Sequence, residues 1–235
     1  MLYSIISSGD IKIAIIQILL TIPIVLFALS CHEAAHAYAA YKMGDRTAFN
    51  LGRMTINPIK HFDLMGSIFM LIFGFGWAKP VPINPRNFRN PKKGMAITGI
   101  AGPLANLILG VIGAFLHTFT VHFGFDWAWG NMTAMYVVYV IALWLANFTM
   151  YNFLFMVYNL IPIPPFDGSR FVTAFLPTKW YFKLMQYERY SFFVVLIINI
   201  VLSRVFDIHP TYDAAELIMH LVSRPFELLF SIISP

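Results

Sequence analysis

The chain has 235 residues, of which 59% are hydrophobic and 11% are charged, and its mean hydropathy is +0.70. These values exclude an ordinary soluble domain, in which roughly a quarter of the residues are charged, and they predict an all-α polytopic membrane protein. The formal net charge of +5 does not indicate nucleic acid as a partner, because the charges lie in loops and fit membrane orientation better. The single cysteine, Cys31, excludes an internal disulfide and is interpreted as a small apolar filler rather than a metal ligand.

The first apolar run, from about Ile11 to Met43, is long enough to cross a hydrocarbon core of about 30 Å. It contains the pattern His-Glu-x-x-His, formed by His32, Glu33 and His36. On a helix the two histidines lie one turn apart on the same face, with Glu33 beside them. This arrangement suits a zinc ion held by two neutral imidazoles, with a carboxylate placed to take a proton from a bound water. The alternative is a pair of interfacial histidines that reach toward water, with Glu33 as a chance neighbour.

The region between Gly44 and Gly94 does not look like a simple membrane span. Alternating apolar and polar residues at 50–56 predict short strands, and the apolar stretch Leu64 to Phe75 is too short to cross the bilayer. Residues 77–94 contain five basic residues, no acid and four prolines, which predict an extended, irregular segment. We therefore expect a small β or re-entrant insertion between the first two long helices.

Two further spans are predicted, from Met95 to about Phe123 and from about Met132 to Leu160. Small residues on one face of the second span would let another helix approach closely; these are Gly99, Gly102 and Ala105. Asn106 on that span either bonds to a neighbouring helix or lines a site, and the sequence favours neither. The third span ends in NLIPIPPFDGSR, whose three prolines cannot continue a regular helix.

Asp167 lies in this unwound segment, and it shares with Glu33 a strong reason to be at membrane depth. A catalytic zinc with two histidine ligands usually takes a third protein ligand and leaves one position open for water. Asp167 is the best candidate for that ligand. The alternative is a turn aspartate that caps a helix starting at Ser169 or Arg170.

The loops richest in Lys and Arg, 77–93 and 170–189, are expected on the cytoplasmic side, which places the zinc ligands in the cytoplasmic half of the membrane. Residues 190–206 form an apolar run that is just long enough to cross. A polar loop is predicted at 207–216. The following stretch, Leu217 to Ile233, is either a poor final span or an amphipathic interfacial helix.

Linked motifs over about Ser30 to Phe175 resemble the site-2 protease family of intramembrane zinc metalloproteases, in its compact bacterial form without PDZ or CBS domains. The motifs, in order, are HEAAH, NPIKHFDLMGSI, FGWAKPVPINP, AGPLAN and NLIPIPPFDGSR. The resemblance implies one membrane-embedded protease domain over 1–235, with a three-helix catalytic core at about 11–175 and accessory C-terminal helices at about 183–233. It also implies one Zn²⁺ per chain, held by His32, His36 and Asp167, with Glu33 as the catalytic carboxylate.

By the same resemblance, Asn106 and Asn159 would line the site, Asn159 would steady the substrate backbone or oxyanion, and His61 would lie near the site. The implied function is cleavage of peptide bonds in or near transmembrane segments of membrane proteins, with those proteins and the bilayer of the cell membrane as partners. Two alternatives are a metal transporter that uses the same ligands and a catalytically silent zinc-binding adaptor. Glu33 at the base position counts against the transporter, and the complete set of catalytic residue types counts against the adaptor.

Overall fold

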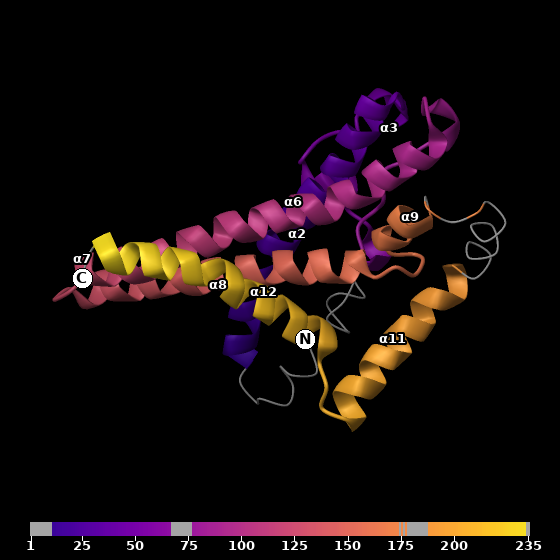
Figure 1. Cartoon of the computed structure of the whole chain (residues 1–235). Helices are drawn as coiled ribbons and strands as arrows, with labels where there is room; N and C mark the ends of the chain where they lie inside the picture. Colours follow the sequence, from indigo (N-terminus) through magenta and orange to yellow (C-terminus); the bar gives the residue numbers. More distant parts are fainter. Residues whose placement is uncertain (1–10, 67–76, 174, 176, 178–187, 234–235) are drawn as a thin grey trace. The chain divides into compact units, whose positions relative to one another are not determined.

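The structure is a computed structural model that describes residues 11–66, 77–173, 175, 177 and 188–233 (Figure 1). Every regular element within these ranges is helical, which confirms the predicted all-α class for this part of the chain. Among the described residues, three helices are long and apolar enough to cross a membrane: Ile15–Met43, Pro91–Trp127 and Met132–Leu160. They agree with the three predicted spans. The chain divides into two compact units, Met1–Ala105 and Asn106–Pro235.

The first unit is built on helix α2, Ile11–Met43, whose 33 residues extend over about 50 Å at 1.5 Å per residue. Two backbone hydrogen bonds terminate the helix at its C-terminal end. The N–H of Gly44 donates to the carbonyl of Tyr41 (3.1 Å), and the N–H of Asp45 donates to that of Ala40 (2.9 Å). Gly44 has φ of +112°, which glycine adopts at little cost. The predicted end of the first helix is therefore confirmed.

Turns between two short helices stand where the sequence predicted strands at 50–56. Helix α3 (Thr47–Asn50) reaches into the strand-like stretch 50–56, and the N–H of Arg53 then donates to the carbonyl of Ala48 (2.9 Å) in the turn that follows. Helix α4 (Pro58–His61) comes next. The strand prediction is wrong for this stretch, because local turn bonds satisfy its backbone. The predicted re-entrant stretch 64–75 lies outside the described residues from residue 67 onward.

The predicted extended segment is present at residues 77–84, which we call the strap. Pro80 and Pro82 have no N–H to offer a neighbouring strand, and no strand partner occurs in the part of the chain that the structure describes. The strap instead bonds to groups elsewhere in its unit. The N–H of Lys79 donates to the carbonyl of His61 (2.8 Å). The strap leads into the 3-10 helix η1 (Pro85–Asn87).

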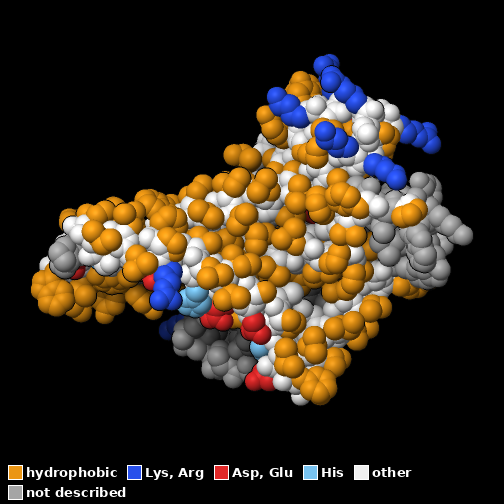
Figure 2. Space-filling view, viewed as in Figure 1, with side chains coloured by type: hydrophobic (Ala, Val, Ile, Leu, Met, Phe, Trp, Pro, Cys, Tyr) orange, Lys and Arg blue, Asp and Glu red, His pale blue; other side chains and the backbone are white. Residues whose placement is uncertain are grey.

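Helix α6 (Pro91–Phe119) begins in the first unit, and its residues from Asn106 onward belong to the second. It continues through the π-helical segment η2 (Thr120–Gly124) and the short helix α7 (Phe125–Trp127). Helix α8 (Met132–Leu160) follows, and its first turn is capped by Asn131, whose Oδ1 accepts from the N–H of Ala134 (3.1 Å). Hydrophobic side chains cover most of the visible surface of the long helices (Figure 2), as a lipid environment requires.

The second unit also contains α9 (Asp167–Thr173), α11 (Glu188–Val205) and α12 (Pro210–Ile233). Helix α12 lies along α8 (Figure 1), and Phe153, Met156 and Ala215 form the buried core between them. The prediction of a polar loop at 207–216 is wrong, because α12 already starts at Pro210. Proline is well suited to a first helical turn, where its missing N–H costs nothing.

Candidate metal centre

Two histidines of α2 face each other inside the first unit. His32 and His36 are 3% and 2% exposed, and their rings meet edge to face with centroids 4.6 Å apart. Their Nε2 atoms are 3.0 Å apart. The one-turn spacing therefore brings the two imidazoles together as predicted.

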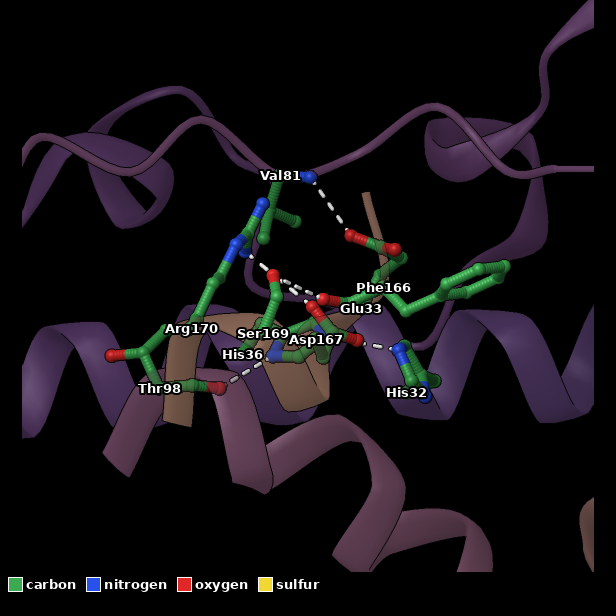
Figure 3. A network of polar contacts seen from close by, with 9 residues as sticks. All are labelled: His32, Glu33, His36, Val81, Thr98, Phe166, Asp167, Ser169 and Arg170. Atoms are coloured by element: carbon green, nitrogen blue, oxygen red, sulfur yellow. Dashed lines mark hydrogen bonds and ion pairs between the residues drawn. The ribbon is translucent and has the colours of Figure 1, made fainter. Parts of the chain in front are cut away.

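The tautomer of His36 follows from its second nitrogen. Nδ1 lies 2.6 Å from the carbonyl oxygen of Thr98 on α6 (Figure 3), and a carbonyl can only accept. Nδ1 must therefore carry the proton, which leaves the lone pair of a neutral His36 on Nε2. A backbone carbonyl in this position is a common way to orient a metal-binding histidine.

The donor set fits a zinc ion. Two nitrogens at about 2.0–2.1 Å from a tetrahedral zinc would be about 3.3 Å apart, close to the 3.0 Å between these two Nε2 atoms. The backbone of α6 also lies close to both rings. A Cβ added at Gly102 would lie 2.5 Å from Nε2 of His32 and 2.5 Å from Nε2 of His36, so only glycine leaves this space open.

Glu33 is 9% exposed, and its Oε2 accepts a hydrogen bond of 2.8 Å from the backbone N–H of Val81 on the strap (Figure 3). The side chain of Val81 is itself buried with Ala37 and Ala48. The strap thus holds the carboxylate that neighbours the histidine pair in sequence. A hydrogen bond to an ionised acceptor is stronger than one between neutral groups.

Asp167 is the first residue of α9 in the second unit and is 7% exposed. The alternative prediction placed Asp167 before a helix starting at Ser169 or Arg170. That start is wrong, because α9 already begins at Asp167. The Nη1 atom of Arg170 lies 3.5 Å from Oδ1 of Asp167. His32, His36 and Asp167 are all buried, and each offers one ligand atom, which is consistent with a zinc site.

No family model matches the chain, but a curated relative does. The chain is 37% identical over 205 residues, which are 87% of its length and 91% of the relative, to the "Putative zinc metalloprotease YwhC" of Bacillus subtilis. The chain belongs to the site-2 protease family.

Two further relatives of this chain have lower sequence identity to it. The "Putative zinc metalloprotease Rip2" of Mycolicibacterium smegmatis is 27% identical over 180 residues, covering 74% of the chain and 64% of the relative. The "Zinc metalloprotease MJ0392" of Methanocaldococcus jannaschii is 28% identical over 167 residues, covering 71% of the chain and 36% of the relative. No solved structure matches.

The three remaining residues that the site-2 protease resemblance implicated each make a hydrogen bond to a group of the protein. His61 is buried on α4, with Nε2 2.7 Å from the carbonyl of Thr55. Asn106 is buried and donates from Nδ2 to Oδ1 of Asn152 on α8 (3.0 Å). Asn159 donates to the carbonyl of Phe155 in its own helix (2.9 Å). Their roles at the site stay predictions.

Three residues contribute to this centre in ways that were not predicted from the sequence. Thr98 acts through its carbonyl and Val81 through its N–H, and backbone groups leave no residue-type signal in a sequence. Gly102 was noted, but as a contact point for a helix. Its closeness to the histidine pair is visible only in the structure, where an added Cβ would lie 2.5 Å from both Nε2 atoms.

Proposed function

We propose that this site-2 protease family member is an intramembrane zinc metalloprotease that cleaves peptide bonds in or near transmembrane segments. The observation that carries the proposal is the pair of buried Nε2 atoms 3.0 Å apart in His32 and His36. With the proton of His36 held on Nδ1 by Thr98, its Nε2 presents a lone pair to the neighbouring ring. A bound cation gives both nitrogens a common partner.

The proposed ligands are His32, His36 and Asp167, with one position left for water. A zinc ion held there would supply Lewis-acid polarisation of the water and of the peptide carbonyl. The neighbouring contacts support the ligand roles. Thr98 orients one imidazole, and Arg170 gives the Asp167 carboxylate a charged neighbour.

Glu33 is the proposed general base. It takes a proton from the attacking water while the water oxygen bonds to the carbonyl carbon of the substrate. The carbon–nitrogen bond then breaks, and Glu33 passes the proton to the leaving amine. The N–H of Val81 occupies Oε2 of Glu33, so Oε1 is the oxygen assigned to proton transfer.

The setting supports substrates drawn from the membrane itself. Both histidines lie within the candidate span Ile15–Met43. A substrate helix has its carbonyls hydrogen-bonded internally, so it has to unwind before one of them is attacked. We propose that the centre lies in the cytoplasmic half of the membrane, because residues 42–93, which follow the histidine pair in sequence, are rich in Lys and Arg.

The decisive test measures zinc content and cleavage together. Purified wild type, Glu33→Gln and Asp167→Ala are compared in detergent against a panel of single-span substrates. Glu33→Gln removes the base and keeps the shape, so we expect a loss of cleavage of about 10²- to 10⁴-fold with zinc retained. Asp167→Ala should bind zinc more weakly. Asp126→Asn, at an exposed carboxylate, is the matched control and should behave as wild type.

Other outcomes would favour the alternatives. Zinc bound by the wild type without cleavage of any substrate, together with zinc flux into vesicles that survives Glu33→Gln, would indicate a transporter. A folded wild type that binds membrane segments equally well with and without Glu33, and cleaves none, would indicate an adaptor. Full cleavage by Glu33→Gln would exclude the proposed base.

A further inference from the structure

A second site lies in the first unit, at the end of α2. It is a cavity of about 440 Å³, which we call the basic pocket, lined by Tyr41, Lys42, Gly44, Arg46, Asn87 and Arg89. Three of its six residues carry a positive charge and none carries a negative one. On the visible face of the molecule, Lys and Arg side chains gather over α3 and the start of α6 (Figure 2). The pocket therefore concentrates positive charge in a concave surface.

No ion pair between described residues joins the three cations of the pocket to an acid. Among the described residues, side-chain ion pairs join Arg170 to Asp167 and His209 to Asp207, and neither involves the pocket. Asp45 is adjacent in sequence but fully buried. Its carboxylate already accepts from Thr47, Asn84 and Asn87. The pocket is left with a net charge that suits an anion.

Aromatic rings position two of the cations. The ammonium of Lys42 lies 5.3 Å from the centroid of the Tyr38 ring. The guanidinium of Arg46 lies 5.8 Å from the centroid of Tyr41, one of the lining residues. Such contacts restrict the side chains without removing their charge or their hydrogen-bond donors.

The backbone around the pocket is tied together across more than 40 residues of sequence. The N–H of Arg89 donates to the carbonyl of Met43 (3.4 Å), and Nδ2 of Asn87 donates to Oδ1 of Asp45 (2.8 Å). A Cβ at Gly44 would lie 3.1 Å from the carbonyl oxygen of Asn87, so the two segments approach closely because position 44 is glycine. The pocket is a preformed feature of the unit rather than a chance grouping of surface side chains.

The position of the pocket indicates the source of the anion. Lys42 ends the candidate span Ile15–Met43, and Arg89 precedes the candidate span Pro91–Trp127 by two residues. Both mark the depth at which lipid headgroups meet a membrane helix. Large apolar side chains lie beside the cations in sequence: Tyr38, Phe49 and Leu51 are 54%, 49% and 61% exposed. An interface with both charges and apolar side chains fits a lipid better than a free anion.

We propose that the basic pocket binds the phosphate of an anionic phospholipid headgroup, with Lys42, Arg46 and Arg89 as its cationic contacts. Arginine is suited to this role because its planar donors pair with two phosphate oxygens at once. This inference does not depend on the proposed protease activity. A bound lipid would also stabilise the α2–α3 turn and the segment after the strap, because both form walls of the pocket.

The test is native mass spectrometry of the detergent-purified full chain with added phosphatidylglycerol or phosphatidylcholine. We expect phosphatidylglycerol to be retained preferentially. The double variant Arg46→Gln with Arg89→Gln should weaken its retention by about 30-fold, as expected from two basic residues near a lipid surface. The matched control is Lys60→Gln with Lys93→Gln, which removes the same charge from exposed residues outside the pocket and should retain the lipid.

Three results would overturn the proposal. The first is equal retention of phosphatidylglycerol and phosphatidylcholine, and the second is an equal loss of phosphatidylglycerol retention in the pocket variant and the control variant. The third is binding of millimolar inorganic phosphate in the absence of lipid, together with displacement of phosphatidylglycerol by it. The last would assign the pocket to a soluble anion. The variant Arg46→Lys with Arg89→Lys keeps the charge and should retain most lipid, which separates a binding effect from misfolding. Gel filtration confirms that each variant is folded.

Discussion

The backbone N–H of Val81 donates a hydrogen bond of 2.8 Å to Oε2 of Glu33 across 48 residues of sequence. The side chain of Val81 is 6% exposed and is buried with Ala37 and Ala48, so both the main chain and the side chain anchor the strap to its unit. A hydrogen bond to a charged group is worth about 1.5–3 kcal/mol. Val81 is therefore a positioning residue for the proposed base.

Replacing Val81 by proline removes this N–H. We expect Val81→Pro to lower kcat/KM on a single-span substrate by about 10- to 100-fold, with zinc per chain unchanged. Val81→Ala is the control, because it keeps the N–H and loses only side-chain packing. It should lower the thermal unfolding midpoint with a smaller loss of cleavage. Equal losses of cleavage in both variants would mean that packing, rather than the hydrogen bond, matters here.

Gly102 offers a test of the metal centre that leaves its ligands intact. A Cβ there would lie 2.5 Å from the Nε2 atoms of His32 and His36, so Gly102→Ala should displace the imidazoles and lower zinc per chain. Gly110→Ala is the matched control on the same helix, where a Cβ would lie 2.4 Å from the ring of Phe153. Both variants should lose stability, and only Gly102→Ala should lose zinc, as measured by atomic absorption. Full zinc in Gly102→Ala would argue against this position of the metal.

The long helices were predictable because their signals are local. The bounds predicted for the first and third spans agree with α2 and α8, because the apolar runs are unbroken. Gly44 ends α2 with a backbone conformation that glycine adopts at little cost, and the side chain of Asn131 caps the start of α8. The pairing of His32 with His36 was predictable for the same reason, since one helical turn fixes it.

The extended form of the strap was predicted from its prolines, but its hydrogen-bond partners were not, because they are distant in sequence. The N–H groups of Val81 and Asn84 bond to side chains of Glu33 and Asp45, 48 and 39 residues away. The sequence of the strap contains no pattern that identifies these acceptor side chains. The start of α12 was missed for a different reason, because the polar residues after Pro210 suggested a loop, although polar residues are common in the first turn of a helix.

Asp45 makes the fold of this region sensitive to acid. Burial raises the pKa of the Asp45 carboxyl, but hydrogen bonds from Thr47, Asn84 and Asn87 outweigh it and lower that pKa below its usual value. A carboxyl with a lower pKa in the folded state contributes stability that is present at neutral pH. This contribution is lost as the pH falls below about 4 and through the folded-state pKa.

The pH dependence is testable with Asp45→Asn in detergent. The unfolding midpoint of wild type should exceed that of Asp45→Asn at pH 7, and the difference should shrink as the pH is lowered below about 4. Asp63→Asn removes one carboxylate elsewhere in the same unit and serves as the control for general charge effects. A difference between wild type and Asp45→Asn that stays constant from pH 7 to pH 3 would show that the ionised form of Asp45 does not carry this stability.

Variants of the buried pair Asn106 and Asn152 can distinguish a structural role of Asn106 from a role at the metal centre. Nδ2 of Asn106 donates to Oδ1 of Asn152 (3.0 Å), and Nδ2 of Asn152 donates to the carbonyl of Phe148 (2.8 Å). Either single alanine variant leaves a buried polar group of the other side chain without this partner. In a double-mutant cycle we expect a coupling of about 0.6–1.7 kcal/mol, the range found between membrane helices.

Cleavage by the same variants decides what Asn106 does. If Asn106 only joins α6 to α8, Asn106→Ala and Asn152→Ala should lose cleavage in proportion to their loss of stability. If Asn106 also lines the site, as the family resemblance implies, Asn106→Ala should lose more cleavage than Asn152→Ala at the same unfolding midpoint. We expect the second result, because Asn106 lies one turn beyond Gly102 on α6, and the added Cβ of Gly102 would touch both histidines. Proportional losses in the two variants would reduce Asn106 to a helix contact.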